Sequence, residues 1–255
     1  MIASARKIKI LRFFFKLLRT ILDFFIKIIF RLKEKKYSVI ISEAFYSPWL
    51  IDEDFKFYLS KIKEFTMLDS VRLYTLWSLI KNIKDKNGII VEIGTWRGGS
   101  SMLIAHRLIN LKMNNIFYAF DTFEGVVKST NKDDYYNDTE HSDCNYDDVK
   151  KQIQNQNLNN LKLIKGIFPD SLPSYSELHD QKFLFAHIDV DTYKSAKDIL
   201  EFLWEKMTKS GIIIFDDYGF HQTNGIRECL DEFVSLKNDC YSHYLTTGQF
   251  LLIKV

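Results

Sequence analysis

Two short acidic segments of the sequence contain residues that could bind a metal ion and remove a proton. One runs from His187 through Asp189 to Asp191, and the other is the pair Asp216 and Asp217. Carboxylates without counter-charges at one place repel and raise one another's pKa values. A hard divalent cation removes that conflict, and oxygen ligands alone are typical of Mg²⁺. Such a cation lowers the pKa of a hydroxyl group, whose proton a nearby carboxylate can take.

These acidic residues also have a simpler interpretation. An Asp that directly precedes a helix caps its first turn, and we expect one of the four aspartates to do so, with Asp191 as the first candidate. His187 precedes the first acidic pair and is the histidine expected to serve the site. The catalytic candidates are therefore Asp189, Asp191 and His187.

A glycine turn between residues 92 and 100 predicts a nucleoside-binding site. It is not the G-x-G-x-x-G turn that brings backbone against a pyrophosphate. Gly94 and Gly98 instead favour close approach to S-adenosylmethionine, which has no phosphate, and Glu92 would lie near its ammonium group or organise the loop. Asp121, at the end of the next strand, is placed to accept hydrogen bonds from the ribose hydroxyls. The predicted cofactor-binding residues are Glu92, Gly94, Thr95, Gly98, Ser100, Asp121, Thr122 and Asp189. A tight turn without a ligand is the alternative.

The elements that must position these residues are short apolar strands that alternate with helices. Strands are expected at 88–93, 115–120, 161–165, 183–188 and 211–215, and helices at 100–111, 195–208 and 224–236. This alternation predicts an α/β fold with a doubly wound, mainly parallel, Rossmann-like sheet. Ligands of such sheets bind beyond the carboxyl ends of the strands, where the acidic segments and the glycine turn lie. Two last strands, at 241–246 and 249–254, predict a C-terminal antiparallel hairpin.

The chain is expected to have three regions. Residues 1–36 form a basic amphipathic helical leader, residues 37–87 a helical cap, and residues 88–255 the domain that binds S-adenosylmethionine. Residues 126–148 are polar, acidic and rich in Tyr, and indicate a long loop or a partly helical insertion that would wall the acceptor pocket. Its polar side chains favour hydrogen bonding to a polyol, namely Asp133, Asp134, Asn137 and Asp138.

Charge is distributed unevenly between the leader and the remaining chain. Residues 1–36 contain 11 Lys and Arg against 2 Asp and Glu, whereas the other residues contain 24 and 31. The acidic body gives no basic face for nucleic acid, so no nucleic-acid partner is expected. The three cysteines are not spaced as metal pairs and indicate a reducing, cytoplasmic location.

The leader places a cationic stripe beside a wide apolar face. The stripe follows a spacing of three or four residues along one side of a helix and consists of Lys9, Arg12, Lys16, Arg19, Asp23, Lys27 and Arg31. Charges interrupt its apolar residues too often for a membrane-spanning helix. The pattern favours a peripheral position on an anionic membrane through residues 6–36, on the inner face. Packing against the body, or against a second subunit in a homo-oligomer, is the alternative.

Several stretches together resemble the macrocin O-methyltransferase family of sugar O-methyltransferases. The resemblance covers the chain from about Thr66 to the C-terminus and rests on residues 91–101, 120–125, 165–173, 187–193, 211–219 and 225–233. It implies a class I methyltransferase fold, S-adenosylmethionine as methyl donor, Mg²⁺ and a sugar hydroxyl as acceptor. It also implies that Asp189 or Asp191, together with Asp216 and Asp217, holds the metal, and that the Asp of the first pair is the base.

The acceptor is the least specified part of this prediction. The residues at 126–128 and Lys194 depart from the family's pattern. A membrane-associated leader favours a glycan, such as a cell-surface polysaccharide or its nucleotide-linked or lipid-linked precursor. Three other functions are open: a catechol-type O-methyltransferase, a nicotinamide dehydrogenase and a non-catalytic, membrane-docked nucleoside-binding module. The missing G-x-G-x-x-G argues against the dehydrogenase, and the carboxylates at two strand ends argue against the module.

Overall fold

The computed structural model describes residues 2–32, 34, 36–42, 44–83, 87–175, 178 and 180–255. Lys33 and Lys35 of the predicted leader, and residues 84–86 of the predicted cap, lie outside the described residues. The chain forms two compact units, which divide between Tyr46 and Ser47. Residues 37–42 and 44–46, predicted as part of the cap, belong to the first unit and have no helical structure.

The first unit is built around helix α1, Ile2–Ile29. Its apolar side chains between Ile8 and Phe30 are largely exposed, with Leu18 at 65% and Phe24 at 60% of their full accessibility. The Asp23 carboxylate accepts a 2.8 Å hydrogen bond from the Val39 backbone N–H, so the segment after the helix lies against it. Among the described residues, no helix combines the length and the apolar character that crossing a bilayer requires.

The second unit contains a seven-stranded sheet in the order β3-β2-β1-β4-β5-β7-β6. The first five strands run parallel, and β7 is antiparallel to both β5 and β6. The predicted doubly wound, mainly parallel sheet with a C-terminal antiparallel hairpin is therefore confirmed. The strands are β1 Ile89–Ile93, β2 Phe117–Asp121, β3 Leu161–Lys165, β4 Phe183–Ile188, β5 Met207–Phe215, β6 Cys240–Tyr244 and β7 Phe250–Lys254.

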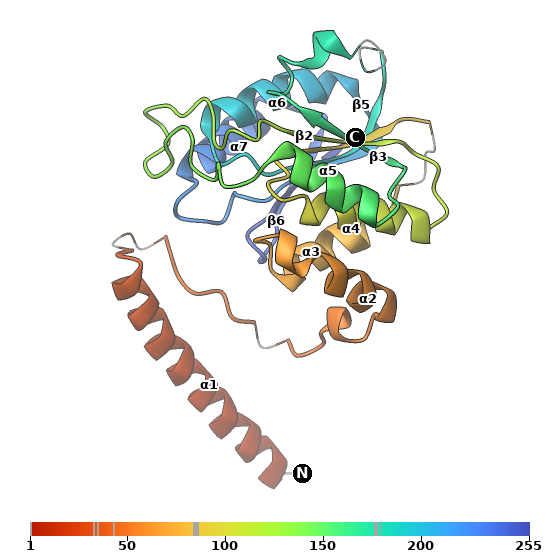
Figure 1. Cartoon of the computed structure of the whole chain (residues 1–255). Helices are drawn as coiled ribbons and strands as arrows, with labels where there is room; N and C mark the ends of the chain where they lie inside the picture. The colour runs from red at the N-terminus through yellow and green to blue at the C-terminus, as the bar shows by residue number, and fades with distance from the viewer. Residues whose placement is uncertain are drawn as a thin grey trace. The chain divides into compact units, whose positions relative to one another are not determined.

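Helices cover both faces of the sheet and form a separate apolar core on each (Figure 1). One core contains α6 and α7, and the other contains α2, α3, α4 and α5. Because both faces are buried, the central strands are apolar almost throughout. The helices are α2 Glu53–Ile62, α3 Ser70–Ile80, α4 Gly99–Asn110, α5 Tyr146–Asn155, α6 Tyr193–Lys206 and α7 Asn224–Leu236, with short 3₁₀ turns η1 Pro48–Leu50, η2 Lys63–Phe65 and η3 Leu172–Ser174.

Helix α5 begins at the end of the segment 126–148, for which the sequence indicated a long loop or a partly helical insertion. Its apolar face consists of Val149 and Ile153, which gives too little periodicity to identify a helix from sequence. The Asn145 side chain accepts hydrogen bonds from the backbone N–H groups of Asp147 and Asp148 and so begins the helix.

Helices α2 and α3 form a cap on helix α4. Asp52 begins α2 by accepting a 2.9 Å hydrogen bond from the Phe55 N–H, and its other oxygen accepts one of 3.1 Å from the Trp77 indole. Asp69 begins α3 by accepting hydrogen bonds from the N–H groups of Val71 and Arg72. This capping fixes the position of Arg72, one turn into α3.

Strand β1 lies at the point where the connections diverge to the two sides of the sheet. It pairs with β2 on one side and with β4 on the other. The carboxyl end of β1 touches that of β4, because a Cβ added at Gly94 would lie 1.7 Å from the Asp189 carbonyl oxygen. Ligand sites of doubly wound sheets occur at such a point.

We expect Gly94→Ala to lower the free energy of unfolding by at least about 3 kcal/mol. The added Cβ would collide with backbone, and Gly94 has a φ of 85°, a conformation that residues with a side chain rarely adopt. Urea denaturation monitored by circular dichroism measures the change. Ile93→Val is the matched control in the same strand end, with an expected loss of about 1 kcal/mol. Equal stability of Gly94→Ala and the wild type would contradict this close approach.

Candidate active site

Three carboxylates gather where β4 and β5 end. Asp189 and Asp191 follow β4, Asp217 follows β5, and one carboxylate oxygen of each lies within 4.8 Å of the others. The two strands are parallel neighbours, with Ile188 paired to Phe215, so their carboxyl ends meet at one edge of the sheet. We call Asp189, Asp191 and Asp217 the carboxylate cluster.

The carboxylate cluster concentrates negative charge in a buried position. Burial raises the pKa of each of its three carboxyl groups well above the ordinary value, and neighbouring carboxylates raise it further. A set of oxygen donors with surplus negative charge suits a hard divalent cation. The residues present therefore fit a Mg²⁺-type ion, which Asp189, Asp191 and Asp217 would hold.

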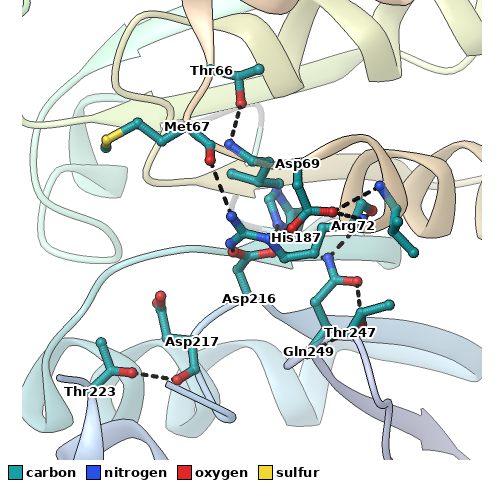
Figure 2. Close-up of polar contacts among 12 residues, drawn as sticks. Thr66, Met67, Asp69, Arg72, His187, Asp216, Asp217, Thr223, Thr247 and Gln249 are labelled. Atoms are coloured by element: carbon teal, nitrogen blue, oxygen red, sulfur yellow. Dashed lines mark hydrogen bonds and ion pairs between the residues drawn. The ribbon is translucent and has the colours of Figure 1, made fainter. Parts of the chain in front are cut away.

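Asp216, the other predicted metal ligand of the second segment, has different partners (Figure 2). Its Oδ2 pairs with the guanidinium of Arg72, and its Oδ1 accepts a 2.9 Å hydrogen bond from the Gln249 amide. Burial alone would raise the pKa of Asp216, but His187 and Arg72 outweigh burial and lower it. The charge of Asp216 is thus compensated by protein groups, whereas the raised pKa values of the carboxylate cluster reflect weaker compensation there.

His187 is fully buried behind these carboxylates. Its Nδ1 is 2.7 Å from Glu92 Oε1, and the other oxygen of Glu92 accepts a hydrogen bond from the Ser101 hydroxyl. Burial alone would lower the pKa of His187, but Asp216 and Glu92 raise it to about 10. Glu92 and His187, predicted at the cofactor and among the catalytic residues, tie β1 to β4 inside the protein.

A cavity at the carboxyl ends of the strands adjoins the carboxylate cluster. It is enclosed by the end of the cap, the glycine turn, the ends of β2 and β4, the long loop, the turn after β3 and one side of α6. Most of the predicted cofactor-binding residues line it, while Glu92 and Gly98 are placed behind the lining. The lining includes Thr66, Met67, Leu68, Gly94, Thr95, Ser100, Asp121, Thr122, His141, Asp189 and Asp191.

Asp121 organises the glycine turn at this cavity. Its Oδ2 accepts hydrogen bonds of 2.7 and 2.8 Å from the backbone N–H groups of Thr95 and Trp96, and its Oδ1 accepts one of 2.7 Å from Phe123 N–H. Burial raises the pKa of Asp121 despite these three donors. The side chain expected to receive a ribose therefore also holds the turn in shape.

The glycines of the turn are required by the protein as well as by any ligand. A Cβ at Gly94 would meet the Asp189 carbonyl, and a Cβ at Gly98 would lie 2.7 Å from the Val149 side chain. Gly98 also has a φ of 81°. Their spacing thus reflects the packing of the turn against β4 and α5, in addition to any approach of a ligand.

None of the four aspartates caps the helix that follows it. Asp133 of the long loop accepts a 2.8 Å hydrogen bond from the Tyr193 N–H and so occupies the position predicted for Asp191. Asp134 binds Asn224, and Asp138 accepts a hydrogen bond from Ser129 N–H. Of the loop residues expected to bind a polyol, Asp133 and Asp134 therefore hold the loop on the domain, and Asp138 ties the loop to itself.

Two other side chains of this loop face the site. His141 lines the cavity, and its ring lies 5.5 Å from that of Tyr136. Burial and, after it, the negative charges of the carboxylate cluster raise the pKa of Tyr136. The composition of residues 126–148 gave no means of separating Tyr136 from its neighbouring tyrosines. Arg72 and Gln249 were also missed, since each lies in an ordinary helix or strand pattern.

The arrangement joins two chemical functions in one place. The cavity offers a shaped turn and the Asp121 carboxylate to a nucleoside, and its wall at Asp189 and Asp191 belongs to the carboxylate cluster. A hydroxyl group placed between the two would face a cofactor on one side and a proton acceptor on the other.

Comparison with known proteins gives a consistent result. The profile of the macrocin-O-methyltransferase (TylF) family matches residues 61–239. Demethyldecarbamoylnovobiocin O-methyltransferase of Streptomyces niveus is 26% identical over 167 residues, which are 60% of this chain and 62% of that protein. A tetracenomycin-C 4'-O-methyltransferase of Streptomyces olivaceus, named for a dimethoxy-rhamnosyl substrate, is 28% identical over 143 residues, or 51% of this chain and 53% of that protein. The chain spans less than two thirds of the length of both relatives.

Solved structures share the fold. That of CalS11, a calicheamicin methyltransferase, superposes with a TM-score of 0.63 at 16% identity, covering 86% of this chain and 99% of that one. At this identity the similarity establishes the architecture, which is that of class I O-methyltransferases.

We expect Asp189→Asn and Asp217→Asn to stabilise the cation-free protein by about 0.5–2 kcal/mol, because each removes one charge from a repelling set. Asp216→Asn should instead destabilise it by about 3 kcal/mol, because Arg72 would lose its buried counter-charge. Urea denaturation with a chelator present measures all three. A similar loss of stability in every variant would contradict this division of the carboxylates.

Proposed function

The chain belongs to the macrocin O-methyltransferase family, and we propose that it transfers the methyl group of S-adenosylmethionine to a hydroxyl group of a sugar. The observation that carries the proposal is the shared wall of the cofactor cavity and the carboxylate cluster, formed by Asp189 and Asp191. A nucleoside-binding module alone would have no use for a cluster of three carboxylates, two of which line that wall.

The cofactor would bind with its ribose at Asp121 and its amino acid end along the glycine turn. Three backbone N–H groups occupy part of the capacity of Asp121, and its two oxygens offer about four acceptor positions. Thr95, Ser100 and Thr122 line the same cavity and supply further hydrogen-bonding groups. The sulfonium would then point toward Asp189, at the carboxyl end of β4.

A divalent cation held by the carboxylate cluster would supply Lewis acidity that lowers the pKa of the acceptor hydroxyl. Asp189 is the group that we propose takes the hydroxyl proton on a carboxylate oxygen. Its backbone contacts Gly94 of the cofactor turn, whereas Asp191 faces the long loop, where Glu140 adds to its negative surroundings. His187 acts as a positioning residue behind Asp216, fixed by Glu92.

Methyl transfer then depends mainly on alignment. The methyl group must move in line from sulfur to oxygen, so the acceptor oxygen has to lie between the cofactor and Asp189. Leu68 from the cap and Val126 and Val127 from the long loop line the cavity and keep water from its apolar part. Because Asp121 lines one side of the cavity and Asp189 another, the acceptor would approach the cofactor from one direction.

A sugar is the proposed acceptor because family members with related sequences are named for sugar methylation. For this chain we propose a glycan made at a membrane, such as a cell-surface polysaccharide or its nucleotide-linked or lipid-linked precursor. Helix α1 supports this part of the proposal: exposed Phe, Leu and Ile side chains lie beside a stripe that contains Lys16 and Arg19. Apolar and cationic faces on one helix are complementary to an anionic membrane surface.

The first test of the function is calorimetric titration of S-adenosylmethionine, and separately of NAD, with Mg²⁺ present. Asp121→Ala should weaken binding of S-adenosylmethionine at least about tenfold, which corresponds to about 1.4 kcal/mol. It would lose both the ribose acceptor and the three contacts that shape the turn.

Asp143→Asn is the matched control for that titration. Asp143 holds the same turn from outside the cavity, through the Trp96 indole and Arg97, so its effect should stay within about threefold. Binding of NAD, or of neither ligand, by the wild type would contradict the proposed donor.

Membrane association is tested with the full chain and sedimenting lipid vesicles. Reversal of two charges, in Lys16→Glu with Arg19→Glu, should weaken binding to phosphatidylglycerol vesicles by at least about 2 kcal/mol, or about 30-fold. Binding to neutral phosphatidylcholine vesicles should be weak for every protein.

Lys150→Glu with Lys151→Glu changes the net charge equally on the surface of α5 and should leave vesicle binding nearly unchanged. Equal loss in both double variants, or a wild type that forms dimers and ignores anionic vesicles, would contradict the assignment of α1 to a membrane.

A further inference from the structure

Arg72 reaches the carboxylates from outside the doubly wound sheet, in the cap (Figure 2). Its Nη1 pairs with Asp216, its Nε is 2.9 Å from Asp69 Oδ2, and its Nη2 donates a 3.1 Å hydrogen bond to the Met67 carbonyl. The guanidinium also lies 5.0 Å from the centre of the Phe220 ring. Only 13% of the side chain is exposed. These contacts hold the Arg72 guanidinium in place, and the guanidinium in turn fixes the position of Asp216.

The side of Asp216 that faces His187 is less well satisfied. His187 Nε2 is 3.8 Å from Asp216 Oδ1, which is too long for a hydrogen bond. Among the described residues this Nε2 atom has no hydrogen-bond partner, although it is buried. Since a buried polar atom without a partner is costly, the pairing of Asp216 with Arg72 leaves the surrounding network incomplete.

Arg72 and a divalent cation would act on the same charges. Asp216 neighbours the carboxylate cluster, where its charge contributes to the repulsion felt by Asp189, Asp191 and Asp217. The positive charge of Arg72 reaches Asp189 as well as Asp216. A cation in the cluster would therefore be repelled by Arg72 and attracted by the carboxylate that Arg72 occupies.

We propose that Arg72 is a built-in counter-cation that competes with the divalent cation for Asp216 and releases Asp216 when the cation binds. The inference rests on the metal site of the proposed function and assigns to that site a positioning residue in the cap. Arg72 can release Asp216 and remain in the cap, because Asp69 binds its Nε and the Phe220 ring lies against the guanidinium.

The exchange would couple the cation to the cofactor cavity. Met67, whose carbonyl Arg72 holds, lines that cavity together with Thr66 and Leu68. The Leu68 N–H is held within the same turn by the Thr66 hydroxyl. Movement of Arg72 would therefore loosen the cap segment at residues 66–69 where it covers the cofactor.

Competition is measured by Mn²⁺ binding, with Mn²⁺ as the probe and free Mn²⁺ quantified by electron paramagnetic resonance. Arg72→Gln should bind Mn²⁺ at least about tenfold more tightly than the wild type, whereas Arg72→Lys, which keeps the charge, should remain within about threefold. In an Asp216→Asn background the effect of Arg72→Gln should shrink to about threefold or less, because the contested carboxylate is absent. Circular dichroism establishes that each variant is folded.

Hydrogen exchange on the wild type gives a second measurement that needs no variant. Mn²⁺ should accelerate amide exchange at residues 66–69, against the usual slowing on ligand binding. Three results would overturn the competition while leaving the metal site in place. They are slower exchange at residues 66–69 with Mn²⁺, a Mn²⁺ affinity unchanged by Arg72→Gln, and an equal gain in Mn²⁺ affinity from Arg72→Gln with Asp216 or Asn at position 216. Absence of Mn²⁺ binding in the wild type and all variants would overturn the metal site itself, and the competition with it.

Discussion

Buried negative charge at the carboxyl ends of β1, β2, β4 and β5 is the constraint on which the rest of the structure depends. Three carboxylates at this edge are compensated by their own hydrogen-bond donors or positive charges. Asp121 has three backbone N–H groups, Glu92 has His187 and Ser101, and Asp216 has Arg72 and Gln249. The carboxylate cluster has far less, since within the described part of the chain the Asp217 carboxylate accepts two hydrogen bonds of 3.2 Å, from the Val190 and Asp191 N–H groups. The charge left over is what gives this edge its capacity for a cation.

The fold and the general position of the site were predictable because they follow from local patterns. Runs of apolar residues followed by Asp121, Asp189 and Asp216 identify strand ends, and a parallel sheet brings such ends to one edge. Register within the sheet then sets the pairing of Ile188 with Phe215, which makes Asp189 and Asp217 neighbours. These steps need no knowledge of distant contacts.

The different roles of the acidic residues were not predictable, because they depend on contacts between residues far apart in the chain. Arg72 lies 144 positions before Asp216, and Gln249 lies 33 after it. Asp133 lies 60 positions before the helix that it caps, so a local rule gave that role to Asp191. The same reasoning explains Gly94: the sequence shows the glycine, but only the approach of β4 shows that the Asp189 carbonyl requires it.

The long loop shows how these contacts narrow the proposed acceptor site. Asp133 ties the loop to α6, Asp134 ties it to Asn224, and Lys132 pairs with Glu228 and Glu232 of α7. A loop anchored to two helices forms a fixed wall, so its anchoring side chains are not free to follow a substrate. His141 at the cavity and Tyr136 beside the carboxylate cluster are the aromatic loop side chains that we place toward the site, next to Val126 and Val127. The proposed sugar would therefore meet two rings on a rigid support, and its hydroxyl would be selected by position relative to Asp189 rather than by closure of the loop.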